Sequence, residues 1–329
     1  MKLQRLHIKN FKSIVDLDIV EPNPFTVFVG PNGSGKSNIF EALDIYANYS
    51  FKHWERFWGD KDELLNIFSN LDYFEIAHVL QDSIGETQSW TSKYSFSSNG
   101  TNIDETSPTN SEWSDRNAPV DNFYLTRCSR INLSSRRWKE HDYLTSDTLS
   151  SSTSNLEKVL KRILQHEVKR EEIKEWLDLF IPGFENIEIV SSELSGTDTL
   201  VMYEKGIKKP FTKDLLSDGT YNILALLTAI YQSDEPQFLC IEEPENGLHP
   251  KVIRELVHFF REACETKGHY IWLNTHSQTL VSELTPEEII LVNKKKGETV
   301  IKQLKNQNLH GLRMDEAWLT AALGGGLPW

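Results

Sequence analysis

A glycine-rich segment near the N-terminus has the residue types of a phosphate-binding loop. It reads Gly30-Pro31-Asn32-Gly33-Ser34-Gly35-Lys36-Ser37, between an almost wholly apolar run and a segment of helical periodicity. In this G-x-x-x-x-G-K-[ST] pattern, backbone N–H groups surround phosphates, the lysine adds a positive charge and the serine hydroxyl binds Mg²⁺. A glycine turn that only joins a strand to a helix is the alternative. We expect ATP to bind at Asn32, Gly33, Ser34, Gly35, Lys36, Ser37 and Asn38, with Ser37 also on the metal.

A pair of adjacent carboxylates forms the second candidate. The apolar run Phe238-Leu239-Cys240-Ile241 ends in Glu242 and Glu243. At the end of a strand, the first carboxylate can face Mg²⁺, directly or through water, while the second reaches a water in line with a γ-phosphate. Alone, such a pair more often begins a solvated loop, so the assignment depends on the phosphate loop earlier in the chain. We expect Glu242 to serve the metal and Glu243 to be catalytic.

Two further segments have groups that can contact a γ-phosphate. Leu216-Ser217-Asp218-Gly219-Thr220 precedes a run of helical periodicity, where a hydroxyl, a glycine and free N–H groups make an anion site. Asn274-Thr275-His276-Ser277 follows an apolar run and offers the imidazole of His276. Taken alone, a serine such as Ser217 is more often a helix cap without a ligand, and a lone histidine is more often structural.

Apolar periodicity predicts the elements that must position these residues. Strands are expected at residues 3–8, as an edge strand, at 25–29, buried on both faces, and at 187–190, 200–203, 238–241, 270–273 and 289–292. Helices are expected at 156–180, at 221–231, and from Pro250 to just before Gly268. Strands that alternate with helices favour an α/β fold with a mixed, largely parallel core sheet.

The middle of the chain differs in character from both ends. We expect a single ATPase domain over 1–329, with a nucleotide-binding core at 1–50 and 184–329 and an insertion, or second lobe, at 51–183. Strands are expected at 73–80 and 94–97. Polar composition predicts mobile loops near 97–119 and 146–155.

Composition limits the class of protein. The 329 residues carry 35 Lys+Arg against 48 Asp+Glu, a formal net charge of -13, so any nucleic-acid binding needs a local basic patch. Three scattered cysteines exclude a disulfide scaffold or a zinc finger. No run is long and apolar enough to cross a bilayer, and the N-terminus lacks a signal-peptide core, so we expect a cytoplasmic protein without a membrane partner.

In this order, the four motifs resemble the ABC-type ATPase heads of the SMC, Rad50 and RecF group. Ile8-Lys9-Asn10-Phe11-Lys12-Ser13 adds to the resemblance, and the run from Glu243 to Pro250 looks like the OLD-like ATPases that accompany phage-defence effectors. The resemblance implies a two-lobed head that dimerises head to head around two ATP and Mg²⁺. Each ATP would lie between the phosphate loop of one subunit and the signature residues Ser217 and Gly219 of the other. Glu243 would position water and His276 would sense the γ-phosphate.

Two positions depart from this pattern. Glu242 stands where many ABC proteins have aspartate, which puts direct metal coordination in doubt, and Asp218 stands where glycine is common. A Q-loop glutamine is not evident, and Gln81 is a candidate only because it follows an apolar stretch.

By resemblance to the ATPase subunits of the PARIS and Septu systems, we expect an ATP-driven sensor or scaffold in anti-phage defence. Only 53 residues follow His276 and they contain no D-x-D nuclease pair, so the partner would be a separate nuclease or toxin. DNA or a phage protein could be the trigger. The alternatives are a RecF- or SMC-like ATPase that clamps DNA, and an assembly module that holds ATP without hydrolysis.

Three weaker features have less certain roles. Lys294-Lys295-Lys296-Gly297 predicts a solvated hairpin turn. The apolar end, residues 318–329, either packs on the core or docks another protein. A basic cluster could touch phosphates of nucleic acid or of a partner's nucleotide: Arg127, Arg130, Arg136, Arg137 and Lys139.

Overall fold

A computed structural model describes residues 2–48, 61–82, 84–97, 100–106, 128–133, 148–191, 198–309 and 311–320. Its centre is a six-stranded sheet in the order β14-β13-β3-β12-β11-β7. The strands are β3 (Phe25–Val29), β7 (Cys128–Asn132), β11 (Phe238–Glu242), β12 (Tyr270–Thr275), β13 (Ile289–Lys295) and β14 (Glu298–Gln303). All neighbours pair in parallel except the β13–β14 hairpin. The predicted α/β fold with a largely parallel sheet is confirmed.

The six-stranded sheet is buried on both faces, and alternate residues of its strands belong to different cores. Val27 and Val29 of β3 face one hydrophobic cluster, whereas Phe28 between them faces the other. Leu239 and Cys240 of β11 divide in the same way. Side chains alternate across a strand, so two covered faces require the continuous apolar runs seen in the sequence.

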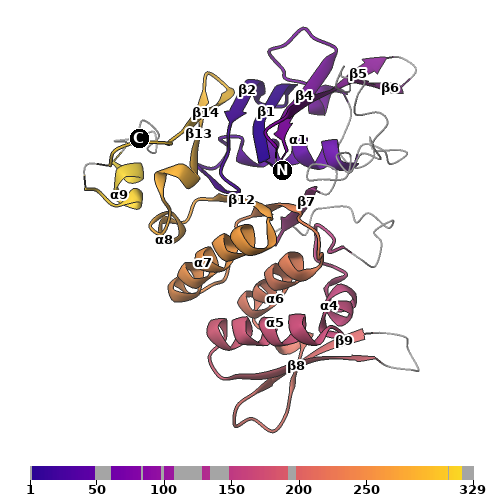
Figure 1. The fold of residues 1–329 in the computed structure, drawn as a ribbon, viewed down its shortest axis with the longest axis vertical. Helices are drawn as coiled ribbons and strands as arrows, with labels where there is room; N and C mark the ends of the chain where they lie inside the picture. Colours follow the sequence, from indigo (N-terminus) through magenta and orange to yellow (C-terminus); the bar gives the residue numbers. More distant parts are fainter. Residues whose placement is uncertain are drawn as a thin grey trace.

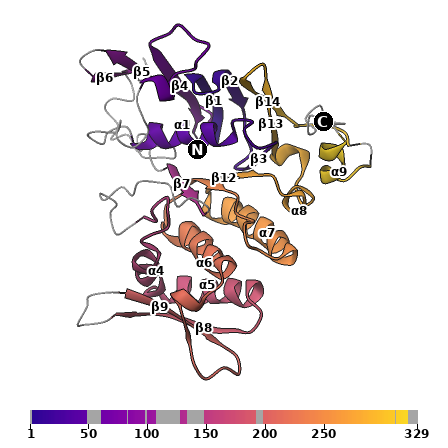
Figure 2. The same cartoon turned by 180° about the vertical axis from the view of Figure 1, so that it is seen from behind.

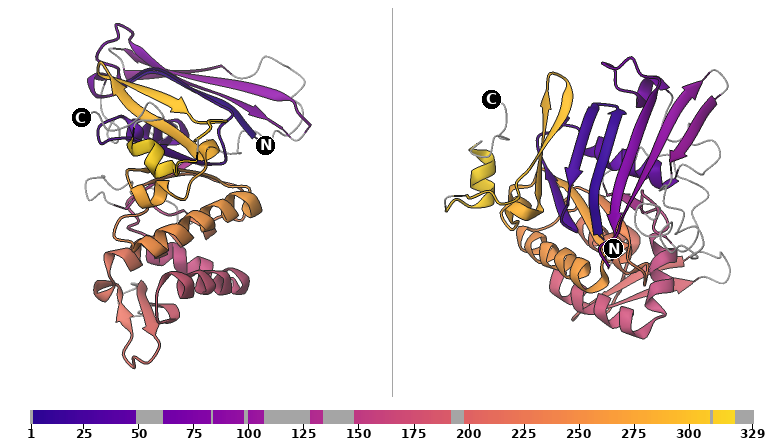
Figure 3. Two further views of the ribbon diagram at one scale, coloured as in Figure 1. Left: turned by 90° about the vertical axis from the view of Figure 1, so that its left-hand side faces the viewer. Right: turned by 45° about the horizontal axis from the view of Figure 1, so that its top comes forward.

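The first face is covered by a long helix and an antiparallel sheet (Figure 1). Helix α1 (Lys36–Asn48) lies beneath that sheet, whose order is β2-β1-β4-β5-β6. The bounds of these strands and of the short helix before β4 are β1 (Lys2–Phe11), β2 (Ile14–Val20), α3 (Lys61–Leu64), β4 (Tyr73–Gln81), β5 (Thr87–Ser97) and β6 (Gly100–Thr106). The right-hand view of Figure 3 shows these strands side by side.

Two expectations for this layer are wrong. The strand at residues 3–8 is not an edge strand, because β1 lies between β2 and β4 and its residues Leu6 and Ile8 are fully buried. Residues 100–106, expected in a mobile loop, form β6, whose pairing with β5 satisfies backbone groups despite the polar composition. Residues 107–119 lie outside the described residues. Strands β4, β5 and β6 lie in the expected insertion but extend the sheet begun by β1. The boundary between core and insertion at residue 51 stays a prediction.

Four helices cover the second face (Figure 2). They are α4 (Leu156–Leu164), α5 (Glu167–Phe180), α6 (Asp218–Tyr231) and α7 (Pro250–Lys267). The single helix expected at 156–180 is two helices, with a break at Gln165 and His166. Helix α7 begins at Pro250 and ends at Gly268, whose φ of 67° gives a left-handed cap as expected.

Beyond these helices lies a small sheet in the order β10-β9-β8. Its strands are β8 (Phe184–Ser191), β9 (Asp198–Glu204) and β10 (Phe211–Thr212), followed by the short helix η3 (Lys213–Leu215). The described part of the loop expected at 146–155 is tied to the helices: Leu149 is buried, and its N–H donates to Gln232 Oε1.

The C-terminal elements pack along the β14 edge of the molecule (Figure 1). They include α8 (Gln278–Val281), η4 (Pro286–Glu288) and α9 (Met314–Leu319). The hairpin turn at Lys296 and Gly297 is confirmed, and Trp318 is buried in the core. The rest of the apolar end, residues 321–329, lies outside the described residues. None of the helices in the described part of the chain is long and apolar enough to cross a bilayer.

Candidate nucleotide site

The parallel register of three strands gathers the predicted residues at one edge of the central sheet. Val29, which precedes the phosphate loop, pairs with Thr275, and Glu242 pairs with Asn274. Since carboxyl ends of parallel strands share one edge, the phosphate loop, the two glutamates and His276 all emerge there. The sequence motifs are therefore close in space although they span most of the chain.

The glycines of the phosphate loop are required by its shape. Gly33 and Gly35 have φ of 76° and 100°, in the left-handed region that favours glycine. A Cβ at Gly35 would lie 2.0 Å from the Thr299 hydroxyl oxygen, and one at Gly30 would lie 2.0 Å from the Val292 carbonyl oxygen. The loop is therefore held tightly against β13 and β14, with Gly33 exposed at its tip.

The polar residues flanking the loop fix its position. Asn38 donates to Ser13 Oγ at 2.7 Å, and Ser13 shares a 2.6 Å hydroxyl contact with Thr299. Thr299 in turn donates to the Ser34 carbonyl at 3.0 Å. Asn38, expected to bind nucleotide, thus braces the loop through its side chain. Ser13 and Thr299 had no assigned role in the sequence, because only the fold brings β14 to the loop.

Lys36 is buried at the start of α1 and faces three carboxylates. Its ammonium donates to the carbonyls of Gly30 at 2.8 Å and Pro31 at 3.1 Å. Burial lowers the pKa of Lys36, and the nearby carboxylates of Glu242, Glu243 and Glu245 act in the opposite direction. A lysine so placed can exchange the two carbonyls for phosphate oxygens.

Ser37 and Glu242 are in direct contact. The Ser37 hydroxyl donates to Glu242 Oε2 at 2.8 Å, and Asn274 Nδ2 approaches the same hydroxyl at 3.4 Å. A hydroxyl and a carboxylate are oxygen ligands of the kind that Mg²⁺ takes, so Ser37 and Glu242 fit such a cation. In the described part of the chain, no cluster of three or more His, Cys, Asp or Glu could hold a metal ion.

Arg130 is a site residue that the sequence interpretation misplaced. Expected in a basic cluster that could touch phosphates, it lies in β7, is 5% exposed and forms an ion pair with Glu242. Its Nε donates to Glu242 Oε1 at 2.5 Å. A run as short and polar as Cys-Ser-Arg-Ile-Asn gives little strand signal, so the pairing of β7 with β11 was not foreseeable. The other members of the cluster lie outside the described residues.

Glu243 and His276 face each other where β11 and β12 end. Glu243 Oε1 lies 3.4 Å from His276 Nδ1, and Glu243 Oε2 accepts a 2.9 Å hydrogen bond from Asn246. Both side chains are partly exposed, at 33% for Glu243 and 47% for His276. Glu243 has φ of 48°, a left-handed backbone that turns the chain sharply after the strand. A carboxylate held by two neighbours and open to solvent can orient a water molecule.

Glu245 joins the glutamate turn to the segment that carries His276. It is 8% exposed and accepts a 2.5 Å hydrogen bond from the Thr275 hydroxyl, and burial raises its pKa. The Thr275 hydroxyl also accepts from the Ser277 backbone N–H at 2.9 Å. This small network fixes the backbone on both sides of His276.

The signature segment is placed at the start of α6. Ser217 caps the helix, and its Oγ accepts from the Thr220 N–H at 3.1 Å. Gly219 touches the turn after Glu243, since a Cβ there would lie 2.4 Å from the Gly247 carbonyl oxygen. Ser217 and Asp218 are exposed, and within the described residues no hydrogen bond joins Ser217 to the phosphate loop of its own chain.

Gln81 does not belong to this site. It pairs with Lys2 at one end of β1, whereas the phosphate loop contacts Ser13, beyond the other end of that ten-residue strand. Its side chain bonds Gln4 and the Gly85 carbonyl. The Q-loop assignment is wrong because an apolar stretch alone does not say which sheet a strand joins.

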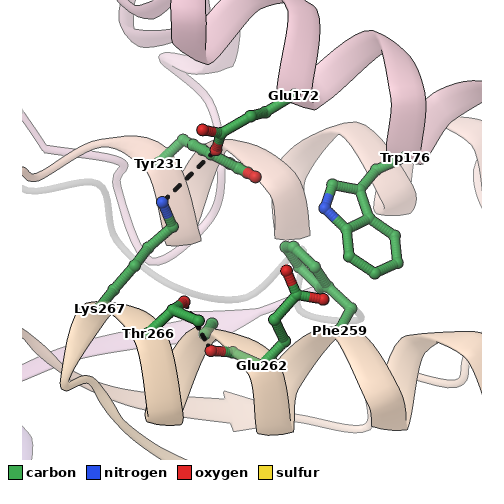
Figure 4. Close-up of a pocket in the computed structure, with 8 residues that line it drawn as sticks. Glu172, Trp176, Tyr231, Phe259, Glu262, Thr266 and Lys267 are labelled. Atoms are coloured by element: carbon green, nitrogen blue, oxygen red, sulfur yellow. Dashed lines mark hydrogen bonds and ion pairs between the residues drawn. The ribbon is translucent and has the colours of Figure 1, made fainter.

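A separate cavity of about 280 Å³ lies between α5, α6 and α7 (Figure 4). Trp176, Tyr231 and Phe259 form its aromatic wall, and Lys267 pairs with Glu172 at its mouth. Tyr231 and Lys267 end helices that begin beside the nucleotide-site edge, so this cavity lies at the opposite edge of the sheet. It cannot take part in the chemistry at Glu243.

Comparison with known proteins agrees with this geometry. Residues 25–282 match the family described as "AAA domain, putative AbiEii toxin, Type IV TA system". A 41-residue stretch is 54% identical to the chromosome partition protein Smc of Methanocaldococcus jannaschii, and a 43-residue stretch is 46% identical to the OLD nuclease of Thermus scotoductus. These stretches cover 12% and 13% of this chain but 4% and 8% of the two relatives.

The fold is that of an SMC head. An Smc head domain with an extended coiled coil, bound to the C-terminal domain of ScpA and derived from Pyrococcus furiosus, has a TM-score of 0.61, with 98% of each chain covered and 14% identity. Since the family match spans most of the chain and the fold matches along nearly all of it, the chain belongs to the AAA_21 family and has the fold of an SMC head domain.

Proposed function

We propose that this protein binds Mg²⁺·ATP and hydrolyses it slowly, as a head-to-head dimer that works as a switch. The observation that carries the proposal is the cluster of Lys36, Ser37, Glu242, Glu243 and His276 at one sheet edge. Lys36 and the loop N–H groups would bind the phosphates, and Ser37 with Glu242 would hold Mg²⁺, which supplies charge neutralisation at the γ-phosphate. Glu243 would orient the attacking water and His276 would contact the γ-phosphate.

The position of Ser217 supports the proposed dimer. Its hydroxyl and the exposed start of α6 are an anion-binding arrangement with no bond to the phosphate loop of the same chain among the described residues. In a two-fold dimer, each copy would offer this surface to the nucleotide of the other. Closure would then depend on ATP, and hydrolysis would release it.

A Glu243→Gln variant tests the catalytic assignment. Glutamine keeps the shape but cannot act as a carboxylate base, so we expect turnover to fall on the order of a hundredfold or more while ATP affinity is kept. Light scattering should show a dimer that persists in ATP and Mg²⁺. Normal turnover in this variant would remove Glu243 from catalysis.

Mixing two inactive variants tests the shared site. Lys36→Met damages the phosphate loop and Ser217→Arg damages the signature surface, so each alone should be inactive. In a mixed dimer, one site combines the intact phosphate loop of the Ser217→Arg subunit with the intact signature segment of the Lys36→Met subunit. Random pairing then restores about a quarter of wild-type turnover. If mixing restores nothing while both variants still dimerise, the site is complete within one copy.

We further propose that the dimer is a sensor or scaffold controlling a separate nuclease or toxin in anti-phage defence. Support comes from the toxin named in the family description and from the similarity to an OLD nuclease. Mass spectrometry of proteins that co-purify with tagged Glu243→Gln, expressed with its neighbouring genes, tests this. A stoichiometric nuclease or toxin supports the proposal. Bound DNA alone, with turnover that DNA stimulates and salt suppresses, would support a RecF- or SMC-like clamp instead.

A further inference from the structure

Arg130 and Ser37 contact different oxygens of the same carboxylate. The Arg130 Nε donates to Glu242 Oε1, and its Nη2 also reaches that oxygen. The other oxygen, Oε2, accepts the Ser37 hydroxyl. Glu242 thus lies between a fixed guanidinium and the hydroxyl expected to contact Mg²⁺, and its side chain is only 10% exposed.

A second arginine–glutamate pair in the same chain has a different geometry. Arg261 contacts both oxygens of Glu288, through Nε at 2.6 Å and Nη2 at 2.8 Å, and also donates to the Glu283 carbonyl. That pair joins α7 to η4 and uses the whole carboxylate. The Arg130 contacts instead converge on one oxygen and leave the other for the phosphate-loop serine. The Arg130 pair therefore leaves one carboxylate oxygen of Glu242 to a second partner. The Arg261 pair occupies both oxygens of Glu288 and is a structural contact.

We propose that Arg130 is the resident counter-cation of Glu242 and weakens the attraction of this carboxylate for Mg²⁺. The inference rests on the proposed Mg²⁺·ATP site. A guanidinium already on Glu242 neutralises the carboxylate that would attract the metal, directly or through a water ligand. Arg130 thereby keeps the buried glutamate paired before loading and lowers the contribution of Mg²⁺ to nucleotide affinity.

Binding of a fluorescent ATP analogue tests this without turnover. The quantity is the ratio of the Kd in EDTA to the Kd in saturating Mg²⁺. In Arg130→Met, the bare carboxylate attracts Mg²⁺ more strongly, so the ratio should rise on the order of tenfold above wild type. Arg261→Met is the matched control, since it breaks an arginine–glutamate pair away from the site and should leave the ratio unchanged.

A Glu242→Gln background shows whether Arg130 acts through the carboxylate. Without that charge, adding Arg130→Met should not change the ratio. If the ratio still rises there, Arg130 acts directly on phosphate and the inference is wrong. An unchanged or lower ratio in Arg130→Met alone would also overturn it.

Two further measurements distinguish failure of the inference from misfolding of the variant and from failure of the proposed function. If Arg130→Met fails to fold, Arg130→Lys keeps the charge with fewer donors and should raise the ratio in the same direction by a smaller factor. If wild-type protein binds no analogue with or without Mg²⁺, the proposed function fails. Binding with an unchanged ratio in the Arg130 variants refutes only the role of Arg130.

Discussion

The two edges of the central sheet hold their polar groups in opposite ways. At the carboxyl edge, ionisable side chains crowd together, with Lys36 and Arg130 among the carboxyl groups at and after the end of β11. At the amino edge, neutral amides and one imidazole form a closed network around Gln237 and His269. Burial lowers the pKa of His269 to about 4, so it is neutral at pH 7.

The difference shows which edge is built to change partners. Buried charges are costly unless paired, and each charged contact at the carboxyl edge is one that a phosphate or metal can replace. The amide network at the amino edge has partners inside the protein and gains nothing from a ligand. The proposed nucleotide site and the stabilising amide network therefore lie at opposite ends of the strands, separated by the length of a five-residue strand such as β11.

The largest expected effect comes from Lys36→Met at the carboxyl edge. Methionine fills a similar volume without charge, so ATP affinity should fall on the order of a thousandfold because the phosphates lose a buried cation. The free energy of unfolding should change little, because removal of a desolvated ammonium offsets the loss of its hydrogen bonds to the Gly30 and Pro31 carbonyls. Isothermal titration and denaturant unfolding check both values. Unchanged affinity would contradict the phosphate-loop assignment.

The next largest effect is a pH dependence that belongs to the amino edge. Burial lowers the folded-state pKa of His269 to about 4, against 6.5 for an exposed histidine, so the unfolded chain binds the proton first as pH falls. Stability is fully present above pH 6.5 and is lost between pH 6.5 and about 4, by up to about 3 kcal/mol. Unfolding of wild type and His269→Asn across this range measures it.

The quantity to compare is the slope of the free energy of unfolding against pH in wild type and in His269→Asn. His269→Asn should lose stability less steeply with acid, although His78, whose pKa burial lowers to about 3, still contributes in the same direction. Equal slopes in the two proteins would mean that His269 gains its proton without cost to the fold.

The smallest effect is expected for Gln237→Leu. The Gln237 amide donates to the carbonyls of Ala229 at 2.8 Å and Ile230 at 3.1 Å, and leucine leaves both acceptors buried without it. We expect a loss of about 2 kcal/mol in the free energy of unfolding and no change in nucleotide affinity. A drop in affinity alongside the lost stability would show that the two edges are coupled, against the separation described above.

The sequence predicted the parts of the fold that local patterns specify. The apolar runs of β3, β11, β12 and β13 and the glycine loop were all confirmed, because buried parallel strands and phosphate loops need those residues nearly regardless of context. The position of β1 inside its sheet and the break before α5 were missed. Both depend on partners distant in the chain.

The candidate site was predicted to a similar degree. Lys36, Ser37, Glu242, Glu243 and His276 are brought together as expected. Arg130 was assigned to the wrong surroundings and Gln81 to the wrong end of a sheet. Neither error could be avoided from the residues, because a single charged or amide side chain carries no information on which strand lies beside it until the pairing is known.

The contact between Gly219 and Gly247 has a mechanical consequence. Each position meets the backbone of the other, so at this point the backbones of the signature helix and of the turn that follows Glu243 are in direct contact. Side chains absorb small shifts by changing rotamer, whereas two backbones in contact cannot. A movement of the turn by a fraction of an ångström is therefore transmitted directly to α6. In the proposed dimer, a change at one nucleotide would be transmitted to the other through the backbone contact between Gly219 and Gly247 in each subunit.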